Sequence, residues 1–490
     1  MPRRTYLAAL ALVLAAALVL QLGLFGIGFH RVSFDESARS LMALGLSWSN
    51  ALEPYIWPPF YKVVVGLALK LWGDVFVVPR LLVGLAGLLA ILALVRLSDL
   101  LFRDRSVNLL TAVLAVAFPH RLVFSVAPLS DIYGYLFILL AAGCALAWLQ
   151  RGSVPQLLLG CACLFAAETV RFEAAFFGLA LFLVVLHRWL LRRELGFGAV
   201  AASAALLFAF PVFWIADTYL WYGSLESLGF TSKQYVATFG RSIMLAFYLS
   251  PAGRNLALEL VWNPLMLGGL AAIAWTASRD EGARAWAFAF GAPFLLITAM
   301  MVLSRSIPMA APWRTTGTWA LLLLPFEAMA VAHLLSWLGR GGGWRRAGGL
   351  AAAAFLLAVA LLPPAVRSAV YVREGMVDGH TGQPRQEREA GLYAARELER
   401  SGGGKALLDS AANLDFLDVL AGSGEPWRFV LSHGTDPIVV ANEAPLGGPP
   451  PEDRFGLARG GSGEALAAEG VRLLLVREPR FVAALEAAGR

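Results

Sequence analysis

The chain has 490 residues, of which 58% are hydrophobic and 15% charged, and its mean hydropathy is +0.66. One or two soluble cores could not bury so much apolar surface, so this composition excludes an ordinary soluble protein. The net charge of +6 is uneven: residues 1–365 hold 26 Lys and Arg against 16 Asp and Glu, whereas residues 366–490 hold 14 against 18. The basic excess lies in the apolar part, where it suits lipid headgroups and orientation signals better than nucleic acid.

The apolar part is predicted to be a polytopic α-helical membrane domain over residues 1–365. Its apolar runs reach about 20 residues, enough to cross a hydrocarbon core of roughly 30 Å, and they lack the alternation of a membrane barrel strand. They predict about eleven transmembrane helices, each closed because lipid cannot satisfy backbone amides. The runs cover residues 6–28, 80–102, 107–119, 128–149, 155–169, 174–190, 197–216, 257–277, 285–303, 315–338 and 347–365.

Arginine-rich connections predict how the domain is oriented. They recur at alternate turns, as expected of cytoplasmic loops. The connections concerned are 103–105, 188–193, 279–284 and 340–346. The N-terminus, with Arg3 and Arg4, is then cytoplasmic, and the chain after residue 365 lies outside an inner or plasma membrane.

The first predicted outer segment, residues 30–79, begins with two adjacent carboxylates, Asp35 and Glu36. Ser33 and Glu36 have the spacing of a capping box, which would explain one of these acids as part of a helix start. Adjacent helical side chains diverge by about 100°, so both acids cannot serve the same cap. The other acid is available for chemistry, and a surface helix is expected over 35–50.

Two consecutive prolines, Pro58 and Pro59, divide this outer segment. Proline is favoured in the first turn of a helix and pushes its predecessor out of the helical region, so one element ends here and another begins. A second surface helix is therefore expected over 60–72. The basic side chains Arg39 and Lys62 could bind substrate or could simply reach lipid headgroups.

Polar residues recur where later spans meet the outer side. Asp131 opens the fourth span, where a first-turn acid is also favoured by the helix dipole. Arg171 and Glu173 join the fifth and sixth spans, and a charge pair at membrane depth marks a functional site unless it is a structural clamp. Arg314 lies in a short outer loop against the orientation rule, and its guanidinium suits a lipid phosphate.

The tail over residues 366–490 is predicted to be a small soluble extracytoplasmic α/β domain. A helix from Gln386 to Arg400 precedes short apolar strands that Gly- and Pro-rich loops separate. The strands are expected at 406–409, 428–431, 438–440 and 471–476. The glycines at 402–404 precede a strand and not a helix, so they indicate a turn and not a phosphate-binding loop.

The first outer segment resembles that of the GT-C-type glycosyltransferases. The family's order is a span that ends in Asp35-Glu36, a surface helix, a Pro-Pro-aromatic motif, a second surface helix that ends at Gly73, and Arg80 at the start of the next span. The pattern is similar to the protein O-mannosyltransferases and the bacterial aminoarabinose transferases of lipid A, mainly over residues 1–190. The aminoarabinose transferases typically carry Lys before the double proline and Arg two residues after the acidic pair. This chain has Trp57 and Ala38 there, which argues against that substrate class.

The resemblance implies an inverting hexosyl- or pentosyltransferase that moves a sugar from a polyprenyl-phosphate donor to an acceptor hydroxyl at the outer membrane face. A carboxylate takes the acceptor proton and cations stabilise the leaving phosphate. The resemblance makes Asp35 the catalytic carboxylate. The candidate catalytic residues are Asp35, Glu36 and Asp131. The candidate substrate-binding residues are Arg39, Tyr61, Lys62, Arg171, Glu173 and Arg314.

Partners other than the donor and membrane lipid stay open, and the acceptor is a protein, a lipid or a glycan. No cofactor is required on this interpretation. Relatives of the mannosyltransferase type work without a metal, and only Asp35, Glu36 and Asp131 are candidate ligands here, so a divalent metal is not favoured. The alternatives are a transporter or lipid flippase and a structural membrane protein. A transporter predicts internal repeats with interrupted helices, which inspection of the sequence does not detect.

Overall fold

The computed structural model describes residues 1–32, 35–52, 57–223, 262–303, 312–339, 344–377, 385–408, 416–431 and 470–475. These residues form two compact units. One comprises Met1–Phe29, Leu52–Phe60 and Val83–Arg373, and is called the helical unit below. The other comprises His30–Ala51, Tyr61–Leu82 and Glu374–Arg490, and is called the loop unit.

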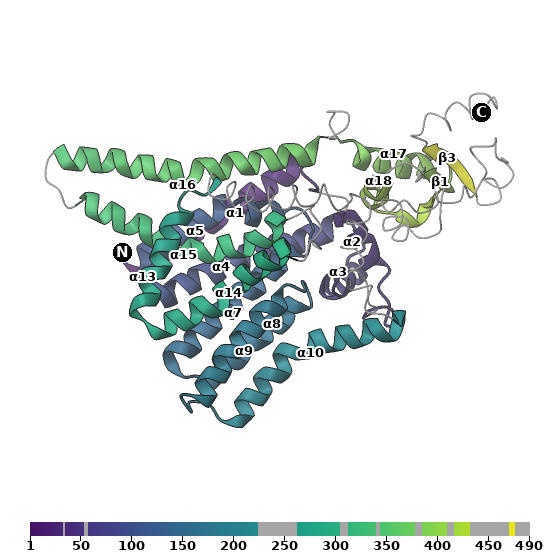
Figure 1. Cartoon of the computed structure of the whole chain (residues 1–490). Coiled ribbons are helices and arrows are strands. Elements are labelled where there is room, and N and C mark those ends of the chain that lie inside the picture. Colours follow the sequence, from purple (N-terminus) through teal and green to yellow (C-terminus); the bar gives the residue numbers. More distant parts are fainter. Residues whose placement is uncertain are drawn as a thin grey trace. The chain divides into compact units, whose positions relative to one another are not determined.

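The helical unit is built from long apolar helices (Figure 1). They are α1 (Arg3–Gly26), α4 (Val77–Phe102), α5 (Arg105–Ala117), α6 (Pro119–Phe124), α7 (Asp131–Arg151), α8 (Val154–Glu168), α9 (Ala174–Leu190), α10 (Phe197–Tyr222), α13 (Met266–Arg279), α14 (Glu281–Leu303), α15 (Pro312–Gly339) and α16 (Trp344–Met376). Every predicted apolar run coincides with one of these helices over the residues described, and the predicted polytopic helical fold is confirmed.

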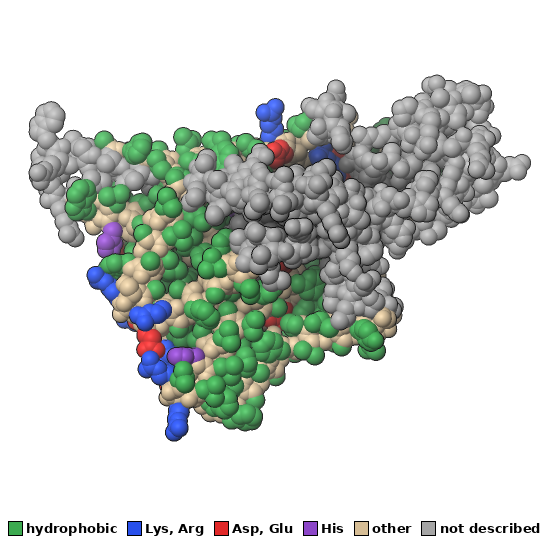
Figure 2. Space-filling model, viewed as in Figure 1, with side chains coloured by type: hydrophobic (Ala, Val, Ile, Leu, Met, Phe, Trp, Pro, Cys, Tyr) green, Lys and Arg blue, Asp and Glu red, His purple; other side chains and the backbone are tan. Residues whose placement is uncertain are grey.

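Five of the described helices are long and apolar enough to cross a membrane by length and composition: Arg3–Gly26, Val77–Phe102, Asp131–Arg151, Phe197–Leu220 and Gly317–Trp337. The apolar helices α5, α8 and α9 are shorter. Large apolar side chains are exposed on these helices, among them Leu12 and Leu220, and Figure 2 shows an apolar face with charged side chains gathered along one edge. Such a surface is stable in lipid and not in water. The number of eleven crossings stays a prediction.

Local chemistry sets the helix ends. The carboxylate of Asp104 accepts from the amide of Ser106 at 2.7 Å and begins α5, and Asp74 accepts from two amides ahead of α4. Gly152, with φ +68°, ends α7 in the left-handed conformation that favours glycine. These signals are local, which is why the predicted ends of the apolar runs lie close to the observed helix ends.

Helix α7 is the most buried of the membrane-crossing candidates. In its most apolar stretch 72% of residues are buried, against 11% in α1. It packs against α8 and α14, while α15 packs against α5 and α13. The first turn of α7 therefore lies inside the protein, and this turn carries Asp131.

An ion pair and a hydrogen bond join segments at the arginine-rich connections that the sequence assigns to one membrane face. Arg192, after α9, donates to Glu281 at the start of α14 at 2.8 Å. Arg105 donates to the carbonyl of Met1 at 2.8 Å, so the N-terminus lies beside the connection that precedes α5. Both pairings are those expected of segments on the same face of the membrane.

The loop unit combines the first outer segment with the C-terminal part of the chain. Its elements are α2 (Asp35–Leu44), α3 (Phe60–Leu71, from Tyr61 on), α17 (Glu387–Arg400), β1 (Lys405–Leu408), α18 (Phe416–Ser423), the 3₁₀ helix η2 (Pro426–Arg428), β2 (Phe429–Leu431) and β3 (Val471–Leu475). The three strands are parallel in the order β2-β1-β3. Helix α18 lies between β1 and β2 in the chain, and α17 packs on β1 and β3.

The observed elements follow the predicted ones closely in this unit. Helix α17 and the three strands lie where a helix and strands are expected, and the predicted strand at 438–440 lies outside the described residues. The glycines at 402–404 have φ of +81°, +92° and +114°, in keeping with the predicted turn. The predicted division differs, because residue 366 lies within α16 and the outer segment groups with the C-terminal part. Tertiary contacts, described below, account for this grouping.

Gly66 lets α2 and α3 approach each other. A Cβ atom at this position would lie 2.6 Å from the carbonyl oxygen of Ala43 and 2.7 Å from the Cβ of Leu46. Gly66→Ala should therefore separate the helices and lower the free energy of unfolding by about 1–3 kcal/mol, measured by thermal unfolding in detergent. Gly73→Ala is the matched control, since its Cβ would meet nothing within 4 Å. Equal stability of the two variants would contradict this packing.

Candidate active site

The double-proline motif lies against the turn between α8 and α9. The amide of Phe60 donates to the carbonyl oxygen of Thr169 at 3.0 Å. The Phe60 ring lies 5.4 Å from the ring of Tyr133 and 5.2 Å from that of Phe137, both on α7. Three segments that are distant in the sequence thus meet in the helical unit, and all three are predicted to face the outer side.

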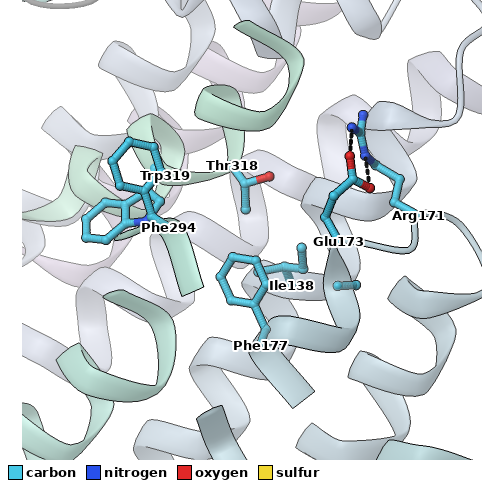
Figure 3. A pocket seen from close by; sticks show the side chains of 8 residues that line it. Ile138, Arg171, Glu173, Phe177, Phe294, Thr318 and Trp319 are labelled. Carbon is cyan, nitrogen blue, oxygen red and sulfur yellow. Dashed lines mark hydrogen bonds and ion pairs between the residues drawn. The ribbon is translucent and has the colours of Figure 1, made fainter. Parts of the chain in front are cut away.

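Arg171 bridges two carboxylates at this meeting point. Its Nη1 donates to Oδ1 of Asp131. Its Nη2 and Nε donate to the two carboxylate oxygens of Glu173 at 2.6 and 3.3 Å (Figure 3). Asp131 is fully buried, and the Arg171 side chain is 16% exposed. The bridge joins the start of α7 to the start of α9. Two carboxylates against one guanidinium leave these three side chains with a net negative charge when both acids are ionised.

The pKa of Glu173 reflects this bridge. Burial raises the pKa of the carboxyl, and the charge and hydrogen bonds of Arg171 lower it by more, so the pKa lies below its ordinary value of 4.5. A carboxyl with a lowered pKa stabilises the fold above its ordinary pKa, and the contribution is lost as the pH falls through the lowered value. The bridge is therefore fully formed at neutral pH.

A small pocket opens beside the bridge. Its lining comes from α7, α9, α14, α15 and the Arg171 turn. The lining residues are Ile138, Arg171, Glu173, Ala174, Phe177, Phe294, Thr318 and Trp319. Figure 3 shows the charged pair on one side and the rings of Phe294 and Trp319 on the other. The pocket thus has a charged side and an aromatic side. Sequence reasoning did not identify the aromatic residues, because no motif distinguishes them from other lipid-facing aromatics.

Two buried polar residues of α6 were also not identified from the sequence. Arg121 is fully buried and donates to the carbonyl of Val116 at 2.9 Å, and His120 beside it is fully buried. Gly317 of α15 lies close to them, since a Cβ there would lie 2.6 Å from the hydroxyl of Tyr135 and 2.9 Å from His120. A His-Arg pair in a predicted outer segment could have pointed to this cluster.

The two acids of the first outer segment have different environments. Asp35 is the first residue of α2 and is partly exposed. Glu36 is fully buried, and its Oε1 accepts from the backbone amide of Val32 at 2.6 Å. Glu36 therefore serves the helix start, as a capping acid does.

The other candidate binding residues of this segment are buried in the loop unit. Arg39 and Lys62 are each 4% exposed, so neither reaches outward as a lipid-facing side chain would. Lys62 donates to the carbonyl of Asn50 at 2.5 Å. The hydroxyl of Tyr61 lies 3.2 Å from that of Ser40, and burial raises the pKa of Tyr61 to about 12 despite the hydrogen bond with Ser40. Tyr61 is thus neutral and serves as a hydrogen-bonding group.

The other statements made from the sequence about this site stay predictions. The side chain of Arg314 lies outside the described residues. The helical unit brings Asp131, Arg171 and Glu173 together, and the loop unit contains Asp35 with the residues around it. Convergence of Asp35 with Asp131 on one cavity, and the absence of a required metal, stay predictions. Within the described ranges no group of three His, Cys, Asp or Glu side chains could hold a metal ion.

No family model and no curated protein matches this sequence. Solved structures of membrane transferases do. ArnT from Cupriavidus metallidurans, an aminoarabinose transferase, is 17% identical in the apo state, with a TM-score of 0.53 over 94% of this chain and 93% of that one. The structure of the same enzyme bound to undecaprenyl phosphate gives 16% identity and a TM-score of 0.54, over 91% and 89%.

The oligosaccharyltransferase of Archaeoglobus fulgidus also matches. Its structure tethered to an acceptor peptide is 12% identical, with a TM-score of 0.53 over 86% of this chain, and the chain spans 64% of its length. The apo form gives a TM-score of 0.55 at 12% identity, over 96% of this chain and 69% of that one. Both are GT-C glycosyltransferases. The protein is an integral membrane protein with the fold of the GT-C glycosyltransferases.

Proposed function

We propose that the protein is an inverting glycosyltransferase that transfers a sugar from a polyprenyl-phosphate donor to an acceptor hydroxyl. One observation carries the proposal: over 91% of the chain the fold follows that of a transferase whose structure holds undecaprenyl phosphate. The sequence resemblance of the first outer segment points to the same family independently. The acceptor is a protein, a lipid or a glycan.

Asp35 is the general base in this mechanism. The acceptor hydroxyl attacks the anomeric carbon, the bond from that carbon to the phosphate oxygen breaks, and Asp35 takes the acceptor proton. Its position as the first residue of α2 and its partial exposure support this role. Glu36 supports the same turn through its bond to the Val32 amide and is not available as the base.

Cationic side chains stabilise the polyprenyl phosphate that leaves. Arg39 and Arg314 are the candidates for this role, and two carboxylates engage the Arg171 guanidinium. Arg171 and Glu173 instead form the charged side of the pocket. Asp131 holds Arg171 and so acts through it.

The reaction takes place on the extracytoplasmic face. The arginine-rich connections support this orientation, and so does the common unit that the outer segment and the C-terminal part form.

Alkaline phosphatase fused after Arg373 should be active in a bacterial host, because only exported phosphatase folds with its disulfides. A fusion within the predicted cytoplasmic connection 340–346 is the control and should be inactive. The reverse pattern would overturn the orientation.

A panel of undecaprenyl-phosphate sugars tests the activity. The purified protein should release undecaprenyl phosphate from one or a few members of the panel in the presence of a cell-envelope acceptor fraction. The anomeric configuration of the product, read by NMR, should be inverted. Movement of the lipid-linked sugar across vesicles without release of undecaprenyl phosphate would favour a flippase instead.

A further inference from the structure

The C-terminal part contacts the first outer segment at the turn that carries Asp35. Asp418 of α18 forms an ion pair with Arg31, and its Oδ1 accepts from the hydroxyl of Ser37 at 2.5 Å. Arg31 also lies 3.5 Å from Oε1 of Glu387 on α17. The side chains of Arg31, Asp418 and Glu387 are 6%, 11% and 16% exposed. Hydrogen bonds between charged groups shielded from water are stronger than those at an open surface.

The two partners of Asp418 bracket Asp35 in the sequence. Arg31 precedes it by four residues, and Ser37 follows it by two residues. Side chains two residues apart on a helix diverge by about 200°, so Ser37 and Asp35 point to roughly opposite sides of α2. Asp418 therefore holds α2 from the side away from Asp35 and leaves the carboxylate accessible.

The helix that carries Asp418, α18, is held by packing within the C-terminal part. Helix α18 packs tightly on α17, since the position of Gly391 on α17 lies directly against the carbonyl of Val419. Helix α17 packs in turn on β1 and β3. A second contact joins α17 to the first outer segment: the guanidinium of Arg388 stacks on the ring of Phe76 at 4.2 Å. The sheet thus fixes Asp418 relative to the outer segment.

We infer that Asp418 is a positioning residue, which fixes the first turn of α2 through Arg31 and Ser37 and thereby aims the Asp35 carboxylate at the reacting hydroxyl. This role rests on the proposed glycosyl transfer. It assigns a function to the C-terminal part: that part completes the catalytic turn. A general base must be held close to its productive geometry, and small displacements reduce turnover strongly.

Hydrogen exchange tests the clamp without any substrate. In the full-length protein in detergent, Asp418→Asn should make the amides of α2 exchange about tenfold faster, as expected for the loss of a charge-assisted hydrogen bond. Glu425→Gln is the matched control: it breaks the 2.8 Å ion pair with Arg428 inside the C-terminal part and should leave α2 unchanged. Unchanged exchange of α2 in Asp418→Asn would overturn the inference.

Kinetics test whether the clamp serves the reaction. With the donor identified in the panel, Asp418→Asn should lower kcat about tenfold and leave the donor KM within about twofold. Ser37→Ala should act in the same direction, and the double variant should be no worse than the stronger single one, since both act on one contact. Unchanged kcat, an effect confined to KM, or additive losses would overturn the positioning role. If the wild type uses no donor of the panel, the proposed function fails, while the exchange experiment still decides whether Asp418 holds α2.

Discussion

Asp35→Asn should reduce turnover by about 10²–10⁴-fold while expression and donor binding stay nearly intact. The amide keeps the shape of the side chain and removes the basic lone pair, so the variant cannot take the acceptor proton. Asp35 begins α2 and is partly exposed. Turnover with the donor from the panel and binding of undecaprenyl phosphate are the two measurements. A loss in kcat with unchanged lipid binding identifies a group that acts on the transition state.

Glu36→Gln is the matched control for Asp35→Asn. The residue is the neighbouring acid, and its carboxylate accepts from the Val32 amide. The amide oxygen of Gln can still accept this bond, so the variant should lose about 0.5–2 kcal/mol of local stability and keep measurable activity. Full activity in Asp35→Asn with loss in Glu36→Gln would assign the chemistry to the other carboxylate. Full activity in both variants would exclude the proposed mechanism.

Arg171→Ala should lower the free energy of unfolding by about 3–5 kcal/mol. Removing the guanidinium breaks the ion pair with the buried carboxylate of Asp131, and breaking a buried ion pair by removing one partner is strongly destabilising. The lost ion pair with Glu173 contributes less to this destabilisation, because the Glu173 side chain is 36% exposed and water screens its charge. Chemical unfolding in detergent measures the loss. The difference from the wild type should shrink below about pH 4.5, where the contribution of Glu173 is lost.

Two further variants show what the Arg171 bridge does. Arg192→Ala breaks the 2.8 Å pair with Glu281, in which both side chains are 49% exposed, and should cost less than about 1 kcal/mol. Combining Arg171→Met with neutral replacements of both acids, Asp131→Asn and Glu173→Gln, should recover most of the stability, because no buried charge then lacks a partner. Recovery of activity together with stability would show that the bridge is a structural clamp alone. A cost for Arg171→Ala as small as that for Arg192→Ala would mean that the bridge does not hold α7 to α9.

The membrane helices could be predicted from the sequence because the features that form them lie within each helix and at its ends. Apolar length and composition decide a crossing, and the ends follow from nearby residues such as Asp104 and Gly152. The same holds for the start of α3 after Pro58 and Pro59. The family resemblance of the first outer segment also rests on a short stretch of chain, and the fold bears it out.

Only the tertiary structure decided which of these elements meet. The sequence showed Arg171 beside Glu173, but it did not pair Arg171 with Asp131, 40 residues earlier. Ser37 and Asp418 are 381 residues apart, and no periodicity or spacing connects them. The structure groups much of the outer segment with the C-terminal part in one compact unit. Hydropathy and caps act within a few residues along the chain, whereas ion pairs and cavity walls depend on how distant elements pack, which local patterns do not encode.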